Sequence, residues 1–180
     1  MNDSNRCMDL PEQHSTTKRG KFPPPIAELL GFTLTGAESG RATVQFEAEE
    51  RHSNPMGTLH GGVLCDIADA AMGIAYSTTL APGETFTTVE LTINFLRPVW
   101  KAKLRAEAKI VHAGKVIGLL ECDIFDEQAR LVARASSTCM TLSGARAAKR
   151  ALPADLSAYL KDAGNSPEQN SAQHDAEHSQ

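Results

Sequence analysis

One stretch of the chain collects residue types that can do chemistry together: Asn54, His60, Gly61, Gly62 and Asp69. A polar loop over residues 51–60 leads into residues 63–80, where an apolar stripe predicts a helix whose buried residues are Val63, Ile67, Ala70, Ala71 and Ile74. Backbone N–H groups at a helix N-terminus lack partners within the helix and carry partial positive charge. Because the two glycines have no side chains, a ligand can reach those amides, and the arrangement suits a developing oxyanion. Asp69 lies about two turns into the helix, where we expect its carboxylate to be partly shielded from water. Such burial raises the basicity of a carboxylate.

Each of these residues also has a structural interpretation. The His-Gly-Gly run can be a turn with a capping role, and His60 can be a structural histidine. Asn54 precedes a proline, as turn-forming residues often do. Asp66 lies about one turn nearer the helix N-terminus than Asp69, and either carboxylate can simply be solvated.

Other chemistries fit this stretch less well. The nearby histidines are His52 and His60, and their spacing from Asp66 and Asp69 does not form a recognisable metal site. Cys65 is a conceivable nucleophile, but a buried cysteine more often serves as a small apolar side chain. We therefore expect neither a metal nor a separate cofactor.

Composition narrows the class of protein. Of the 180 residues, 41% are hydrophobic and 22% charged, which is typical of a globular chain and not of collagen, a coiled coil or a disordered chain. The net charge of −4 argues against a nucleic-acid partner. No apolar run is long enough for a membrane span, and no secretory signal is visible. Four scattered cysteines, without a CxxC pair, indicate reduced thiols and a cytoplasmic location.

The remaining pattern predicts an α+β domain. A short helix at 26–30 closes at Gly31, and apolar alternation indicates strands at 32–34 and 43–48 around a turn at 36–40. Strands follow at 85–96, 103–111, 116–125 and 130–142, with Leu131, Ala133, Ala135 and Thr138 expected on one face of the last. Strands joined by tight turns form an antiparallel sheet, and the long helix should lie on its concave face. The other face then needs a partner, which predicts an oligomer.

The ends of the chain differ from this body. We expect a disordered tail over residues 1–21, one domain over 22–145, a C-terminal helix over 146–162 and a second disordered tail over 163–180. The last segment contains no Val, Ile, Leu, Met, Phe, Trp, Tyr or Cys, so it cannot bury enough apolar surface to offset its ordering entropy.

Together the motifs resemble a known family. Asn54, then His60-Gly61-Gly62, then Asp69 nine residues after the histidine, is similar to the hotdog-fold acyl-CoA thioesterases of the PaaI-like group. The strand TTVELTINFLRP over Thr87–Pro98 and the hairpin over His112–Lys115 extend the resemblance to about residues 24–143.

The resemblance implies an antiparallel sheet wrapped around one long central helix, paired into dimers and usually tetramers, with active sites at the dimer interface. It makes Asp69 the catalytic acid, as general base for water or as nucleophile, and makes the Gly61 amide the group that polarises the thioester carbonyl. Asn54 and His60 would orient that carbonyl or hold the loop. Thr88 stands where the family has a Ser or Thr that helps to position water. Segments that contact coenzyme A in the family contain Glu90, His112, Gly114 and Lys115.

The function implied is hydrolysis of an acyl-CoA thioester to a free carboxylic acid and coenzyme A, which is itself part of the substrate. Two alternatives stay open. Some hotdog proteins bind or sense acyl-CoA without turning it over. A hydroxyacyl-thioester dehydratase would need a histidine and an acid acting together, for which His60 and Asp69 are a conceivable pair.

Overall fold

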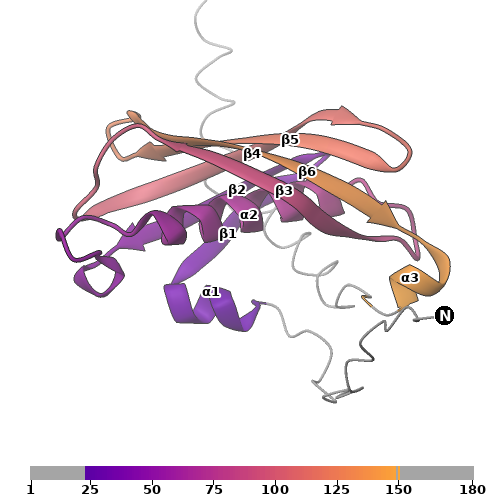
Figure 1. The fold of residues 1–180 in the computed structure, drawn as a ribbon, viewed down its shortest axis with the longest axis horizontal. Coiled ribbons are helices and arrows are strands. Elements are labelled where there is room, and N and C mark those ends of the chain that lie inside the picture. Colours follow the sequence, from indigo (N-terminus) through magenta and orange to yellow (C-terminus); the bar gives the residue numbers. More distant parts are fainter. Residues whose placement is uncertain (1–22, 149, 151–180) are drawn as a thin grey trace, which may run out of the picture.

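The computed structural model describes residues 23–148 and residue 150, and within them a six-stranded antiparallel sheet curls around one long helix, α2 (Figure 1). The elements are α1 (Pro25–Leu30), β1 (Phe32–Glu38), β2 (Arg41–Ala48), the 3-10 helix η1 (Glu50–His52), α2 (Gly61–Ser77), β3 (Thr85–Phe95), β4 (Ala102–Ala113), β5 (Ile117–Asp126), β6 (Leu131–Leu142) and α3 (Gly144–Ala148). The predicted α+β class, with a sheet wrapped around a central helix, is confirmed.

The order of strands in the sheet is β1-β2-β4-β5-β6-β3. β3 therefore does not pair with β4, which follows it in the chain, but with β6. This leaves β1 and β3 as the two edge strands. The predicted turn at 36–40 is too wide, because β1 continues to Glu38 and only Ser39 and Gly40 turn, both with positive φ.

The core lies between α2 and the concave face of the sheet. Ile67 and Ala71 of α2 are fully buried, as predicted, whereas Val63, Ala70 and Ile74 are only partly buried. The buried face of α2 also contains residues that lie outside the predicted stripe: Leu64, Ala68, Met72, Ala75 and Tyr76. The thin helix does allow close approach, since a Cβ on Gly73 would lie 3.0 Å from the Phe86 ring.

In α1, Ala27 is buried, whereas Ile26 and Leu29 are 43% and 69% exposed. One side-chain prediction outside α2 is wrong. In β6, Ser137 instead of Thr138 faces the core with Ala133 and Ala135. Gly31 ends α1 as expected, in the left-handed conformation with φ 82°.

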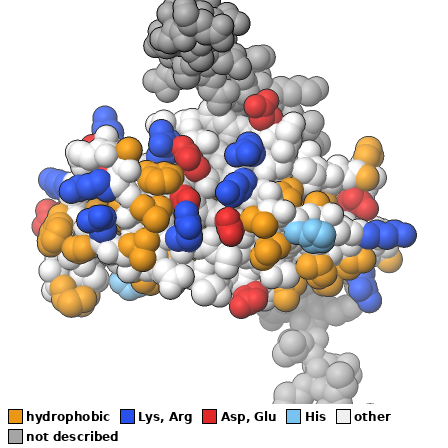
Figure 2. Space-filling model, turned by 90° about the horizontal axis from the view of Figure 1, so that it is seen from above, with side chains coloured by type: hydrophobic (Ala, Val, Ile, Leu, Met, Phe, Trp, Pro, Cys, Tyr) orange, Lys and Arg blue, Asp and Glu red, His pale blue; other side chains and the backbone are white. Residues whose placement is uncertain are grey.

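The outer face of the sheet is charged over its middle and more hydrophobic toward its ends (Figure 2). Neighbouring strands pair these charges, as Arg134 with Asp123 at 2.6 Å and Lys109 with Glu121 at 3.8 Å. A face whose charges are satisfied by cross-strand pairs is suited to water.

The predicted tails at 1–21 and 163–180 lie outside the described residues, as does most of the predicted helix at 146–162. α3 covers only its start. Among the described helices, none is long and apolar enough to cross a membrane. The cytoplasmic location stays a prediction.

Candidate active site

The N-terminus of α2 is held by His60, the residue before its first turn. The Gly62 N–H donates to His60 Nδ1 over 2.9 Å, and the Val63 N–H donates to the His60 carbonyl over 3.0 Å. Because Nδ1 accepts a hydrogen bond, the neutral ring carries its proton on Nε2. Among the described residues, the Gly61 N–H has no acceptor. One polarised helix-terminal donor is therefore left for a ligand.

Asn54 closes the loop that leads to this helix. Its Oδ1 accepts hydrogen bonds from the Met56 N–H at 2.9 Å and the Thr58 N–H at 3.2 Å, and its Nδ2 donates to Thr58 Oγ1 at 2.8 Å. The loop is also anchored by the Leu59 N–H, which donates to the Val99 carbonyl at 2.7 Å. This geometry favours the loop-holding role of Asn54, and residues 23–148 and 150 provide no acceptor for its second Nδ2 hydrogen.

Asp69 lies on the side of α2 that faces β3. Thr88 donates from Oγ1 to Asp69 Oδ1 over 3.0 Å, so the two predicted site residues are in contact. The Asp69 side chain is nevertheless exposed, against the expectation that it would be shielded from water. The reason is its place on α2, outside the buried face that packs on the sheet.

Gly61 and Asp69 do not meet within one chain. They are eight residues apart on the same helix, and at 1.5 Å per residue that places them about 12 Å apart along its axis. An oxyanion donor and an attacking group must both lie about 3 Å from the same carbonyl. His60 is likewise separated from Asp69, so the pair that a dehydratase would use is not formed in the single chain.

The predicted coenzyme A residues are spread across the sheet, from Glu90, two residues after Thr88, to the β4–β5 hairpin. Glu90 pairs with Thr138, Thr138 with Leu119, and Leu119 with His112, so Glu90 and His112 share one row across the sheet. Three strand spacings put them about 14 Å apart.

The β4–β5 hairpin that holds Gly114 and Lys115 lies at the opposite end of the sheet from the loop at residues 51–60 (Figure 1). The Gly114 N–H donates to the Ile117 carbonyl over 2.8 Å, so it is not available to a ligand. Lys115 is exposed and has no ion-pair partner among the described residues.

The sequence reasoning missed Phe95 at the end of β3. A Cβ built on Gly61 would lie 2.8 Å from the Phe95 ring, so the ring lies directly over the start of α2. Both residues line a groove of about 350 Å³ together with Asn54 and Arg97. Only the glycine, which leaves room for an aromatic ring, gave a signal in the sequence.

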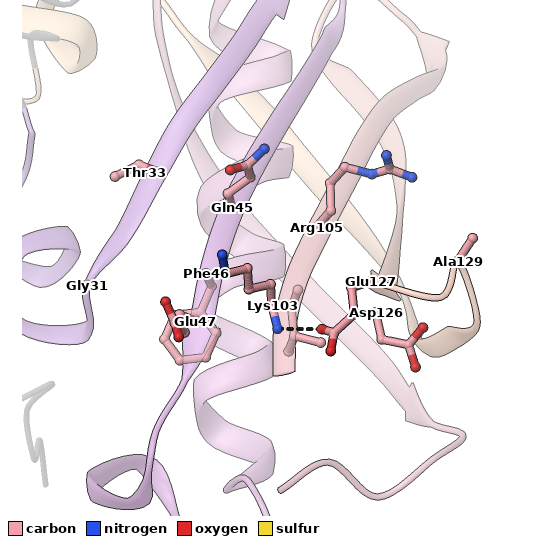
Figure 3. Close-up of a pocket in the computed structure, with 11 residues that line it drawn as sticks. Gly31, Thr33, Gln45, Phe46, Glu47, Lys103, Arg105, Asp126, Glu127 and Ala129 are labelled. Atoms are coloured by element: carbon pink, nitrogen blue, oxygen red, sulfur yellow. Dashed lines mark hydrogen bonds between the residues drawn. The ribbon is translucent and has the colours of Figure 1, made fainter. Parts of the chain in front are cut away.

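A larger groove of about 490 Å³ lies on the other face of the sheet (Figure 3). Gln45, Glu47, Lys103 and Arg105 line it, and the Lys103 N–H donates to Glu127 Oε2 over 2.7 Å. Because the sheet separates it from α2, this groove is not part of the site around Asp69.

Cys65 does not have the environment of a nucleophile. Burial raises the pKa of its thiol, and the neighbouring Asp66 carboxylate raises it further. The reactive form of a cysteine is the thiolate, which is therefore disfavoured at neutral pH. Within residues 23–148 and 150, no group of three or more His, Cys, Asp or Glu side chains could hold a metal ion.

Comparison with known proteins agrees with this fold. The model of the thioesterase superfamily matches residues 56–133. Over 107 residues the chain is 32% identical to 1,4-dihydroxy-2-naphthoyl-CoA hydrolase of Listeria monocytogenes, covering 59% of this chain and 87% of that protein. It is 31% identical to the acyl-coenzyme A thioesterase PaaI of Escherichia coli over 108 residues, 59% of this chain and 75% of that protein.

The solved structure of the E. coli PaaI protein, from the phenylacetic acid degradation operon, superimposes with a TM-score of 0.62 at 28% identity. The match covers 66% of this chain and 85% of that one. Sheet, central helix and relatives together define a hotdog protein. This chain belongs to the thioesterase superfamily.

Proposed function

We propose that this protein is an acyl-CoA thioesterase, which hydrolyses an acyl-CoA to a free carboxylic acid and coenzyme A. The observation that carries the proposal is the Gly61 N–H, which has no acceptor in the described part of the chain and lies at the start of the helix that also carries the exposed Asp69 carboxylate. Two of the relatives are named as enzymes that act on CoA thioesters, which supports coenzyme A as the carrier of the acyl group.

The reaction needs only these groups. The Gly61 N–H stabilises the negative charge that develops on the thioester oxygen as the carbonyl carbon becomes tetrahedral. Asp69 either attacks that carbon or removes a proton from the water that does so. When the tetrahedral intermediate collapses, the carbon–sulfur bond breaks and coenzyme A leaves as a thiolate that takes up a proton. If Asp69 is the attacking group, this leaves an anhydride between Asp69 and the acyl group, which water then hydrolyses to release the carboxylic acid and restore the carboxylate.

The neighbouring side chains orient these groups. Thr88 holds Asp69 through its 3.0 Å hydrogen bond. His60 and Asn54 hold the loop and the first turn of α2, and through them they fix the direction of the Gly61 N–H.

The site is completed by a second copy of the chain. Because Gly61 and Asp69 are about 12 Å apart on one helix, two antiparallel α2 helices would place Gly61 of one protomer beside Asp69 of the other. β3 supports this pairing, because within the described residues it pairs with β6 on one side and with no strand on the other. Its exposed Val89 and the partly buried Ile74 of α2 provide apolar surface for the contact.

Two such dimers would form the tetramer that the resemblance implies. In that assembly Glu90, His112, Gly114 and Lys115 are proposed to contact coenzyme A. His112 and Lys115 are exposed on the β4–β5 hairpin, where Lys115 supplies positive charge for phosphate groups and His112 can donate a ring N–H to them.

A thiol-release assay tests the proposal. The purified protein is incubated with acetyl-, hexanoyl-, lauroyl-, palmitoyl-, benzoyl- and phenylacetyl-CoA, and the free thiol is measured. We expect release from at least one of them, in a ranking that identifies the acyl group. Binding of acyl-CoA without release from any substrate would overturn the proposal in favour of a sensing protein.

A further inference from the structure

A β-bulge in β3 lies beside the contact between Thr88 and Asp69. Thr88 pairs with Cys139 of β6 and Glu90 pairs with Thr138, so Val89 is an extra residue with no partner opposite. A bulge disrupts the ladder locally and re-aims the neighbouring side chains. Thr88 is such a neighbour, and it points from the sheet toward α2.

Ser137 of β6 is bonded to this bulge. Its Oγ donates to the Glu90 carbonyl over 2.9 Å, and its side chain is almost fully buried. The hydroxyl thereby satisfies a backbone oxygen on the bulged segment. Because this hydrogen bond is made to the bulged segment, the hydroxyl favours the bulged conformation.

Cys139 connects Ser137 to Thr88. The Cys139 Sγ lies 3.9 Å from Ser137 Oγ and is fully buried. Burial raises the pKa of the Cys139 thiol, hydrogen bonds with the Ser137 and Thr88 side chains act in the opposite direction, and the Asp69 charge raises it again. A continuous line of polar groups therefore runs from Asp69 through Thr88 and the thiol to the bulge.

We propose that Ser137 is a positioning residue, whose hydroxyl fixes the β3 bulge so that Thr88 presents its Oγ1 to Asp69. The proposal rests on the thioesterase function above, in which Asp69 is the reacting carboxylate. Cys139 is the fully buried residue of β6 that pairs with Thr88. Neither residue touches the substrate.

A double-mutant cycle measures whether Ser137 acts through Thr88. In the wild-type background we expect Ser137→Ala to lower kcat about tenfold while KM stays within about twofold. In the Thr88→Val background the same change should have no further effect on kcat. Equal losses in both backgrounds would overturn the proposal, because they would mean that Ser137 acts independently of Thr88.

Two variants control for stability. Ser136→Ala removes the neighbouring hydroxyl, which lies on the other face of β6, and should leave kcat unchanged. Ser137→Cys keeps a side chain of similar size with a weaker donor, and we expect its kcat to lie between wild type and Ser137→Ala. If Ser137→Ala does not fold, full activity in Ser137→Cys overturns the proposal.

A crystal structure of Ser137→Ala provides a readout that needs no substrate. We expect the Thr88 Oγ1 to leave Asp69, or the bulge at Val89 to shift. An unchanged bulge and an unchanged 3.0 Å contact would refute the positioning role even in an active enzyme. Absence of thiol release by the wild-type protein would instead refute the thioesterase function, and the crystal structure would still decide the role of Ser137.

Discussion

Thr88 Oγ1 donates a hydrogen bond to Asp69 Oδ1 over 3.0 Å, which ties an edge strand of the sheet to the middle of the central helix. The two residues are 19 positions apart in the sequence. The contact restricts the rotation of the carboxylate although the Asp69 side chain is exposed. In the proposed dimer this is the position from which the carboxylate reaches a thioester held by the partner's helix N-terminus.

Replacing Thr88 tests the value of this contact. We expect Thr88→Val, which keeps the branched shape but has no hydroxyl, to lower kcat about tenfold with little change in KM. Thr88→Ser keeps the donor and should retain most of the activity. Steady-state kinetics of wild type and both variants give the comparison. Equal activity in Thr88→Val and wild type would show that the Thr88 hydroxyl has no role in the reaction.

Replacing His60 separates capping from direct catalysis. We expect His60→Ala to lower the free energy of unfolding by about 1 kcal/mol, because the Gly62 N–H loses its acceptor. His60→Asn provides another acceptor at the cap and should keep both stability and activity. Urea denaturation and thiol release are measured on each variant. A stable but inactive His60→Asn would show that the imidazole itself takes part in the reaction.

Replacing Lys115 tests the proposed coenzyme A contact. We expect Lys115→Ala to raise KM for an acyl-CoA about tenfold and to leave kcat nearly unchanged, because a charge-assisted contact to phosphate is lost. The N-acetylcysteamine thioester of the same acyl group has no phosphates and should show no difference. Lys101→Ala, a change at an exposed lysine outside the β4–β5 hairpin, serves as control. An equal rise in KM for both thioesters would contradict a phosphate contact.

Asp126, the last residue of β5, gives the fold a dependence on pH. Burial raises the pKa of its carboxyl, but hydrogen bonds from the Arg130 and Gln128 backbones and from the Arg130 side chain, with the charge of Arg130, lower it by more. A lowered pKa in the folded state stabilises the protein above the unfolded value of about 3.9, and this contribution is lost as the pH falls through the folded value.

We therefore expect Asp126→Asn to be less stable than wild type at pH 7, and the difference to shrink below about pH 4. Urea denaturation at several pH values measures it, with the exposed Asp66→Asn as control. A difference that stays constant down to pH 3 would mean that the charge of Asp126 is not its source.

Much of the fold could be predicted because its periodicity is visible in the sequence. The helix after His60 and the strands on either side of the hairpin at 112–115 lie within a few residues of their predicted positions. The placement of β3 could not be predicted, since its residues pair with residues of β6 that lie 38 to 57 positions later, and no local pattern records such a pairing.

Side-chain directions were predicted less well where both faces of an element look alike. β6 has small residues on both faces, so the sequence did not distinguish Ser137, which is buried, from Thr138, which is not. For the site, the sequence left open whether Asn54 and His60 act on the substrate or hold the loop, and the hydrogen bonds of both favour holding. Nothing in the sequence indicated that Asp69 is exposed, because its exposure depends on which face of α2 the sheet covers.

The measurement that tests the central claim most directly compares Asp69→Asn with Asp66→Asn in the thiol-release assay. Both changes are nearly isosteric, and both residues are exposed on α2 about one turn apart. We predict that Asp69→Asn folds as wild type does and loses at least about 99% of kcat, as removal of a general base or nucleophile requires. Asp66→Asn should retain its activity. Full activity in Asp69→Asn would contradict the assignment of Asp69 as the reacting carboxylate and with it the mechanism proposed for this protein.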